Sequence, residues 1–143
     1  MSPRGKSLLS LQRRWRWVYL GWDAATASLA YLMLYSFRKT VIEPALFGLE
    51  AMPWNNDLYT GMLATTLLWI ASLWLVGMYN NPLRKSRLKE MGRIVQVGIV
   101  FVLGYFLAFL LDDHVGSAVD YLHTGGRFAS GLLLLSLGGR IFI

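Results

Sequence analysis

The sequence has no cysteine, which excludes disulfide bonds, thiolate zinc sites and cysteine nucleophiles. Charged residues are also scarce, because they make up 15% of the 143 residues, against about 25% in ordinary soluble proteins. Hydrophobic residues make up 55%, and a soluble domain of this size would lack the polar side chains needed to cover its surface. The composition therefore argues against a disordered chain and against a soluble domain, and the length allows one domain, residues 1–143.

Recognisable catalytic and metal-binding motifs are missing as well. The glycine pairs at 125–126 and 138–139 lack the residues and spacing of a phosphate-binding loop, and no nucleophile elbow is present. One group of acidic residues and histidines has none of the spacings of a compact metal site, and its members are Asp112, Asp113, His114, Asp120 and His123. We expect a solvated outer loop there, and we assign no catalytic residue, metal site or cofactor to this chain.

Long apolar runs give the chain its organisation. The runs Leu58–Leu83 and Ile94–Leu111 contain no charged residue, and Trp17–Phe37 contains only Asp23. Each can cross a hydrocarbon core of about 30 Å, which takes about 20 helical residues. A fourth run, Phe128–Gly139, is long enough only if Arg127 snorkels outward and the helix continues to the end. The sequence thus predicts an all-α integral membrane protein, a bundle of four transmembrane helices near 15–38, 58–79, 93–112 and 122–143.

Basic and acidic residues alternate between the segments that flank these runs. The N-terminal segment, the second loop and the C-terminal end are basic, whereas the first and third loops carry more acidic than basic residues. Since Lys and Arg accumulate in cytoplasmic loops, this pattern predicts that both termini are cytoplasmic, in a multi-pass protein of the bacterial inner membrane. The chain has a net charge of +6, and its basic residues lie beside apolar runs. Anionic lipid headgroups, and not nucleic acid, are therefore the expected counter-charge.

Asp23 is an acidic residue inside the first expected span. A carboxylate there costs a few kcal/mol unless it is paired or protonated. It also interrupts the apolar run that a cleaved signal peptide requires, which favours an uncleaved anchor. Two roles are open for Asp23. One is an ion or substrate site, and the other is a structural group that faces the bundle near Tyr19 or a basic residue of the cytoplasmic ends.

The second loop is the densest charged stretch of the chain. Its basic residues are Arg84, Lys85, Arg87, Lys89 and Arg93. They serve as an orientation signal, and they are also a candidate docking surface for lipid headgroups, a lipid-linked phosphate or a cytoplasmic module. Leu88 and Met91 lie three residues apart and share a helical face, so we expect a short amphipathic segment along the cytoplasmic interface.

Three stretches carry a resemblance to a known family. They are Trp17–Pro44, which ends in FRKTVIEP, then Gly77–Arg93, GMYNNPLRKSRLKEMGR, and Phe109–His123, FLLDDHVGSAVDYLH. Together they resemble the N-terminal membrane region of the large polyprenyl-phosphate sugar-1-phosphate transferases of bacteria, in particular the Bacteroidetes-type, undecaprenyl-phosphate glucose/galactose phosphotransferase-like members. The resemblance covers nearly the whole chain, and its most specific part is the YNNPLRKSRLKE loop.

The resemblance implies a role in starting exopolysaccharide, capsule or O-antigen synthesis. Members of the family move a sugar-1-phosphate from a UDP-sugar to undecaprenyl phosphate, and their chemistry resides in a C-terminal module with an Asp-Glu pair and bound magnesium. No residue of this chain matches that module, so we expect these residues alone to be inactive. The ending LSLGGRIFI has the look of an interrupted chain. The partners implied are membrane lipids, undecaprenyl phosphate, a cytoplasmic catalytic module and a second copy of the chain.

Two other functions are open on the sequence. One is a small multidrug-type transporter, in which four short helices dimerise around an intramembrane acid, here Asp23. The position of Asp23 near the edge of its span counts against this reading. The other is an accessory membrane protein without chemistry of its own.

Overall fold

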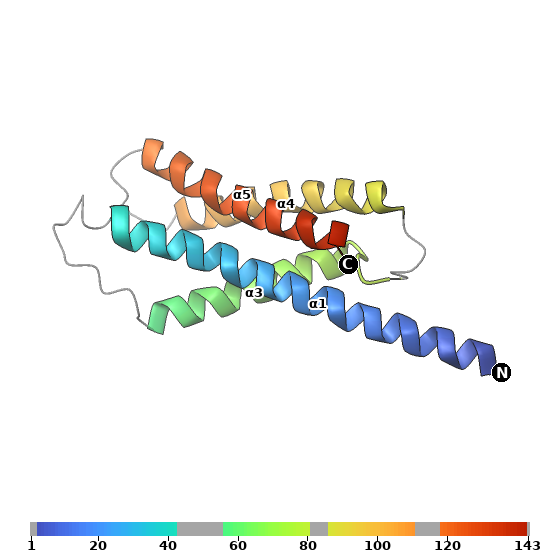
Figure 1. The fold of residues 1–143 in the computed structure, drawn as a ribbon. Helices are drawn as coiled ribbons and strands as arrows, with labels where there is room; N and C mark the ends of the chain where they lie inside the picture. The colour runs from blue at the N-terminus through green and yellow to red at the C-terminus, as the bar shows by residue number, and fades with distance from the viewer. Residues whose placement is uncertain (1–2, 43–55, 81–85, 111–117, 143) are drawn as a thin grey trace.

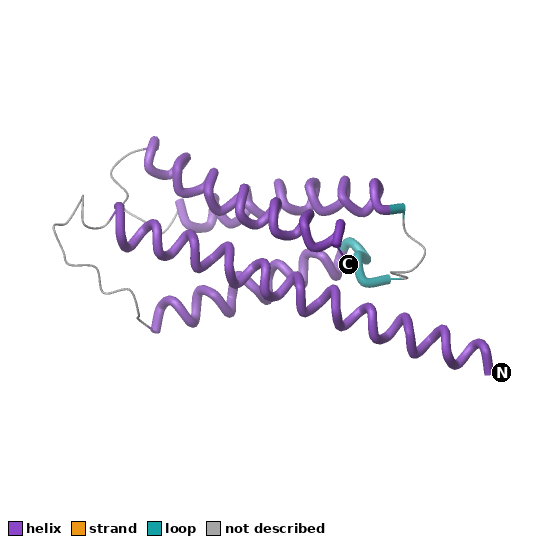
Figure 2. Tube along the Cα trace, viewed as in Figure 1, coloured by secondary structure: helices purple, strands orange, loops and turns teal. Residues whose placement is uncertain are grey.

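A computed structural model describes residues 3–42, 56–80, 86–110 and 118–142. Four long helices account for most of them: α1 (Pro3–Phe37), α3 (Asn56–Leu75), α4 (Arg87–Leu110) and α5 (Ala118–Phe142). A short π-helix, η1 (Arg38–Ile42), continues α1. Figure 2 draws helix and turn, and no strand, across this described part of the chain. The expected all-α, four-helix fold is therefore confirmed.

The four helices form an up-and-down bundle in which consecutive long helices run in opposite directions (Figure 1). Helix α1 packs against both α3 and α5, and α5 also packs against α4. The N-terminal part of α1 extends beyond the other helices, and the N- and C-terminal ends lie at the same end of the bundle (Figure 1). The turn after α3 and the start of α4 also lie at this end, which we call the terminal end.

Helix α1 begins earlier than the sequence suggested, at Pro3 instead of near residue 15. Proline is tolerated in the first turn of a helix, and after Gly5 neither glycine nor proline occurs before the apolar run that starts at Trp17. The basic segment before the apolar run is therefore helical and continuous with it. This explains why α1 projects from the bundle.

Helix α3 ends four residues before the predicted position 79, at a glycine-based C-cap. Gly77 has a φ of +71°, in the left-handed region that favours glycine. The Met78 amide donates to the Leu73 carbonyl (3.0 Å) and the Gly77 amide donates to the Trp74 carbonyl (2.9 Å), which is the Schellman pattern. Met78 and Leu73 are both buried, as this motif favours. The cap reverses the chain and directs the buried Tyr79 back toward α1.

The centre of the bundle is apolar and rich in aromatic rings. Trp69 of α3 meets Phe101 of α4 edge to face, with ring centroids 5.2 Å apart. Tyr105 stacks on both Phe101 and Phe128 of α5, at 5.9 and 5.0 Å. Small residues of α1 complete the core, and Ala27 and Ala30 have no exposed surface. Offset and edge-on ring pairs of this kind add to the stabilisation from burial.

The outside of the bundle is also apolar. Large hydrophobic side chains are exposed along the helices, among them Leu63, Leu67, Leu68, Trp74, Leu75, Ile99, Val100, Leu103, Leu107 and Leu134. Of the described helices, two are long and apolar enough to cross a membrane by length and composition, Asn56–Leu75 and Arg87–Ala108. The sequence predicted four such spans. Helices α1 and α5 fall short because α1 contains Asp23 among many aromatic and hydroxyl residues, and α5 contains Arg127, Arg140 and several glycines.

Two adjacent glycines of α5 provide a test of this packing. A methyl group at Gly139 would overlap the indole ring of Trp22, whereas one at Gly138 would meet nothing within 4 Å. We expect Gly139→Ala to lower the free energy of unfolding by about 1–3 kcal/mol through overpacking. Gly138→Ala should be neutral or slightly stabilising, because alanine is the better helix former. Unfolding of the detergent-solubilised chain, followed by circular dichroism, gives both values, and equal effects of the two variants would contradict the packing of α5 on α1.

Candidate functional site

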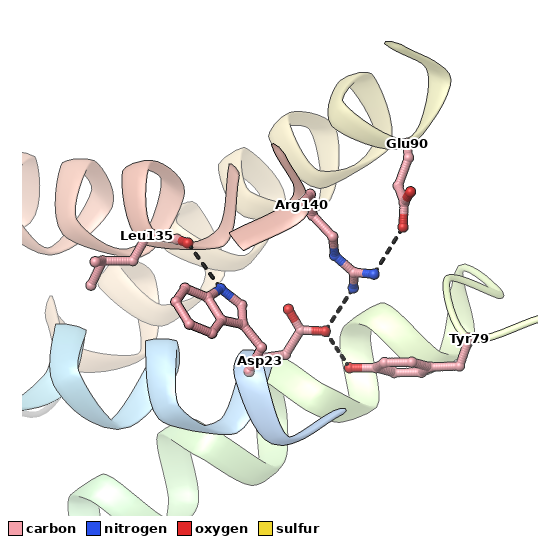
Figure 3. A network of polar contacts seen from close by, with 6 residues as sticks. Asp23, Tyr79, Glu90, Leu135 and Arg140 are labelled. Carbon is pink, nitrogen blue, oxygen red and sulfur yellow. Dashed lines mark hydrogen bonds and ion pairs between the residues drawn. The ribbon is translucent and has the colours of Figure 1, made fainter. Parts of the chain in front are cut away.

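A buried network of charged and polar side chains lies at the terminal end of the bundle (Figure 3). The Arg140 guanidinium is at its centre. Its Nη2 atom is 2.7 Å from Oδ2 of Asp23, and its Nη1 atom is 2.8 Å from Oε1 of Glu90. The Tyr79 hydroxyl donates to the same Asp23 oxygen at 2.8 Å. We call Asp23, Tyr79, Glu90 and Arg140 the buried network.

Every long helix supplies or positions one member of this network. Asp23 comes from α1, Glu90 from the first turn of α4, and Arg140 from the last turn of α5. Tyr79 follows the glycine cap of α3. The Tyr19 ring of α1 also lies against Arg140, with the guanidinium carbon 4.2 Å from the ring centroid, a cation–π distance. The network therefore ties all four helices together at one end.

The members of the network are almost completely removed from solvent. Asp23 is 0% exposed, Arg140 3% and Glu90 7%. Burial, with the neighbouring Asp23 carboxylate, raises the pKa of Tyr79 above its ordinary value. The phenol therefore stays protonated and acts as the hydrogen-bond donor. Two carboxylates and one guanidinium are held at contact distance, and their attraction offsets part of the high cost of burying these ions.

Some polar atoms of this region have no partner among the described residues. They are Oδ1 of Asp23, Nε of Arg140 and Oγ of Ser136, and all three are buried. Ser136 lies one helical turn before Arg140 on α5, so the three atoms belong to one end of the bundle. The network therefore has one hydrogen-bond acceptor, Oδ1 of Asp23, and one donor, Nε of Arg140, that its own members do not pair.

The buried network is suited mainly to holding the helices together. Both carboxylates accept hydrogen bonds from the guanidinium, and Arg140 cannot act as a proton donor in catalysis because arginine stays protonated. Asp23 is also enclosed by α1, α5 and the Tyr79 turn, so it presents no exposed oxygen to a substrate. The geometry corresponds to the second of the two roles considered for Asp23, a group facing the bundle beside Tyr19 and a basic residue.

The basic residues of the second loop lie apart from this network. Arg84 and Lys85 are outside the described residues. Arg87, Lys89 and Arg93 are exposed at the start of α4, and Nη1 of Arg87 donates to the Ile141 carbonyl at 2.9 Å. The first turns of α4 thus direct Glu90 inward and these three cations outward. Leu88, expected on an apolar face, is 83% exposed, whereas Met91 is half-buried.

The acidic and histidine residues of the third loop are described only in part. Asp112, Asp113 and His114 lie outside the described residues, and of Asp120 only the backbone is described, in the first turn of α5. His123 is exposed. Within the described ranges no three His, Asp or Glu side chains are placed to hold a metal ion together.

Sequence reasoning missed the roles of Glu90, Tyr79 and Arg140. A signal for Arg140 was present: it ends the fourth apolar run, and Asp23 lies near the start of the first. In an antiparallel bundle these two positions fall at the same end.

Comparisons with protein-family models, with curated protein sequences and with solved structures find no match for this chain.

Removal of the central cation tests the buried network. Arg140→Gln leaves Asp23 and Glu90 buried without their counter-charge, and we expect a loss of about 3–5 kcal/mol of stability. The triple variant Asp23→Asn, Glu90→Gln, Arg140→Gln removes every charge and should recover part of this loss. Arg93→Gln is the matched control on an exposed arginine and should change stability by less than about 0.5 kcal/mol. Thermal unfolding in detergent measures all three, and an Arg140→Gln variant as stable as the control would contradict the network.

Proposed function

We propose that this chain is a membrane-embedded domain of four transmembrane helices in the bacterial inner membrane. The observation that carries the proposal is the distribution of polarity, because charged side chains are buried in the bundle while Leu, Ile, Val and Trp cover its outside. Monomeric soluble proteins rarely expose continuous apolar surfaces of this extent. In a lipid bilayer this apolar surface contacts hydrocarbon. The charged side chains pair with one another inside the bundle, as charged residues within membranes do.

The proposed orientation places the terminal end of the bundle in the cytoplasm. Exposed cations gather at this end: Arg13, Arg14 and Arg16 on the projecting part of α1, and Arg87, Lys89 and Arg93 at the start of α4. Positive charges of this kind are retained on the cytoplasmic side. In this proposal α1 and α5 also cross the membrane, since Asp23 of α1 pairs with Arg140 of α5 inside the bundle.

We further propose that the domain anchors a sugar-1-phosphate transferase that acts on undecaprenyl phosphate. This rests on the resemblance of the RKTVIEP and YNNPLRKSRLKE stretches to the membrane region of that family. The second of these leads into the exposed cations of α4, which lie on the side where a UDP-sugar is available. The magnesium and nucleotide chemistry belongs to the family's catalytic module, and this chain supplies membrane attachment and a basic surface for lipid phosphate or for that module.

The pairing of Asp23 with Arg140 favours the anchoring role over the transporter role. A proton-coupled transporter of the small multidrug type needs a carboxylate that exchanges a proton for a cationic substrate. Here the carboxylate already has a guanidinium at 2.7 Å and a phenol at 2.8 Å. A substrate cation would have to displace Arg140 from the centre of the buried network.

Cysteine labelling tests the orientation, because the chain has no background cysteine. Ser86 and Asn56 are exposed at opposite ends of the bundle. We expect a membrane-impermeant maleimide to modify Asn56→Cys in intact spheroplasts and Ser86→Cys only after permeabilisation. Modification of both variants in intact spheroplasts would contradict a four-span arrangement with cytoplasmic termini.

A chimera tests the transferase role. This chain replaces the native membrane region of a phosphoglycosyl transferase, and lipid-linked sugar is measured in membranes supplied with UDP-sugar. We expect product from the chimera, a severalfold loss when residues 84–89 are reordered at constant charge, and little change when residues 13–16 are reordered in the same way.

Two controls accompany the chimera. The purified chain of residues 1–143 should release no UMP from UDP-sugars with magnesium and undecaprenyl phosphate, because none of these residues matches the family's catalytic motif. Expression and topology of each chimera are checked by labelling Asn56→Cys. A correctly inserted chimera without product would refute the transferase role, and full activity after reordering residues 84–89 would leave the basic loop with orientation as its only role.

A further inference from the structure

A groove lies between α1, η1 and α5 at the end of the bundle opposite the buried network. Its volume is about 600 Å³, and it opens to the outside of the molecule. Met33 and Phe37 of α1 form one side, and Gly131, Leu134 and Leu135 of α5 form the other. Met33 is 52% exposed and Leu134 70% exposed, so the apolar walls face the surrounding medium. In the proposed orientation that medium is the outer leaflet of the membrane.

One cation stands at the polar end of this groove. Arg127 lines it together with Thr40, and its guanidinium carbon lies 3.8 Å from the centroid of the Phe37 ring. This stacking fixes the guanidinium over the groove wall and leaves its N–H groups free of the ring. No ion pair joins Arg127 to a carboxylate of the described residues. The groove therefore combines an apolar channel with a positive charge that pairs with no carboxylate of the described residues.

The hydroxyl groups along the groove do not compete for this charge. Ser36 donates to the Met33 carbonyl, Thr40 to the Ser36 carbonyl and Ser130 to the Arg127 carbonyl. Their protons are thus used within their own helices. Among the residues that line the groove, the donors available to a ligand are those of the Arg127 guanidinium, which matches the geometry of a phosphate group.

The groove runs along the axis of α5 from Arg127 toward Leu134 and Leu135. Seven or eight helical residues span roughly 10–12 Å, so an apolar chain in the groove would lie parallel to the helices and therefore along the membrane normal. A soluble phosphate compound would leave the apolar walls of the groove without a contact, and an apolar chain alone would leave the Arg127 guanidinium without one. The chemistry requires an amphiphile with an anionic head and a hydrocarbon tail.

We propose that this groove binds an anionic phospholipid of the outer leaflet, with the phosphate on Arg127 and one acyl chain along Met33, Gly131 and Leu134. The inference rests on the membrane embedding proposed above and not on the transferase role. Binding would hold the ends of α1 and α5 together where the buried network does not reach.

Lipid binding to the purified chain in neutral detergent tests the site, with native mass spectrometry as the readout. Dioleoyl phosphatidylglycerol is the anionic probe and dioleoyl phosphatidylcholine the zwitterionic one, and glycerol phosphate tests a free headgroup. We expect phosphatidylglycerol to bind about fivefold more tightly than phosphatidylcholine, the effect of one cation worth about 1 kcal/mol. Excess glycerol phosphate should not displace it.

Two variants separate the head from the tail. Arg127→Gln should remove the roughly fivefold preference for phosphatidylglycerol, with Arg14→Gln, an exposed arginine on the projecting part of α1, as its control. Gly131→Leu should weaken both lipids, because an added Cβ already lies 3.5 Å from Sδ of Met33 and a longer side chain fills the groove. Gly104→Leu is the control for bulk, because nothing lies within 4 Å of a Cβ there. Circular dichroism establishes that each variant is folded, and Arg127→Lys should retain the lipid preference.

The outcomes distinguish this proposal from the membrane proposal. Equal affinity for the two lipids, displacement by glycerol phosphate, or an unchanged preference in Arg127→Gln would overturn the lipid site. Extraction of the chain from membranes by alkaline carbonate would overturn the membrane embedding, and the lipid site with it. A chain that resists extraction but shows no lipid preference refutes the lipid site alone.

Discussion

Arg140 lies between two carboxylates from two other helices, and one end of the bundle is organised around it. Moving each of these ions out of water costs several kcal/mol, which is recovered only with good geometry and additional hydrogen bonds. The distances of 2.7 and 2.8 Å and the Tyr79 hydroxyl supply that geometry. Loss of Arg140 leaves two buried carboxylates without a counter-charge, and loss of Tyr79 removes a hydrogen bond from one of them. The network therefore fixes the axial positions of α1, α4 and α5 relative to one another, and the turn at Gly77 must place Tyr79 correctly for the same reason.

Apolar packing alone would not specify these positions. In lipid, Leu and Val on the outside of a helix gain little by moving to the inside, because hydrocarbon surrounds them in both places. The aromatic contacts around Trp69 and Tyr105 favour close packing, but neighbouring apolar positions along a helix offer similar contacts. A buried ion pair has one position in which it is satisfied. In the proposed membrane setting, specificity of register thus comes from the polar groups at one end and cohesion from the rings at the centre.

The sequence predicted the helices well and the network poorly, and the reason is physical. A long apolar run predicts a helix from its own residues alone, so Leu58–Leu83 and Ile94–Leu111 indicated α3 and α4 directly. The boundaries depended on subtler features: Gly77 ended α3 early, and the basic residues before Trp15 extended α1. Asp23 was recognised as an unusual residue, but its partner is 117 residues away. Glu90 was hidden among the cations of the second loop, since charge counting does not show which side of a helix a residue faces.

The two ends of the bundle differ in a way that suits the anchoring role. At the proposed cytoplasmic end, ion pairs join α1, α4 and α5, and the Tyr79 hydroxyl connects the end of α3 to them. The exposed cations Arg87, Lys89 and Arg93 lie at the same end as this network. An enzyme that transfers a group to a lipid phosphate must be held at a fixed height above the headgroups. The buried network would hold the helix ends in place for this purpose. At the other end, an open groove lies between α1 and α5. The buried ion pairs are thus concentrated at the end where the proposed cytoplasmic module would attach, and the groove lies at the end proposed to face the outer leaflet.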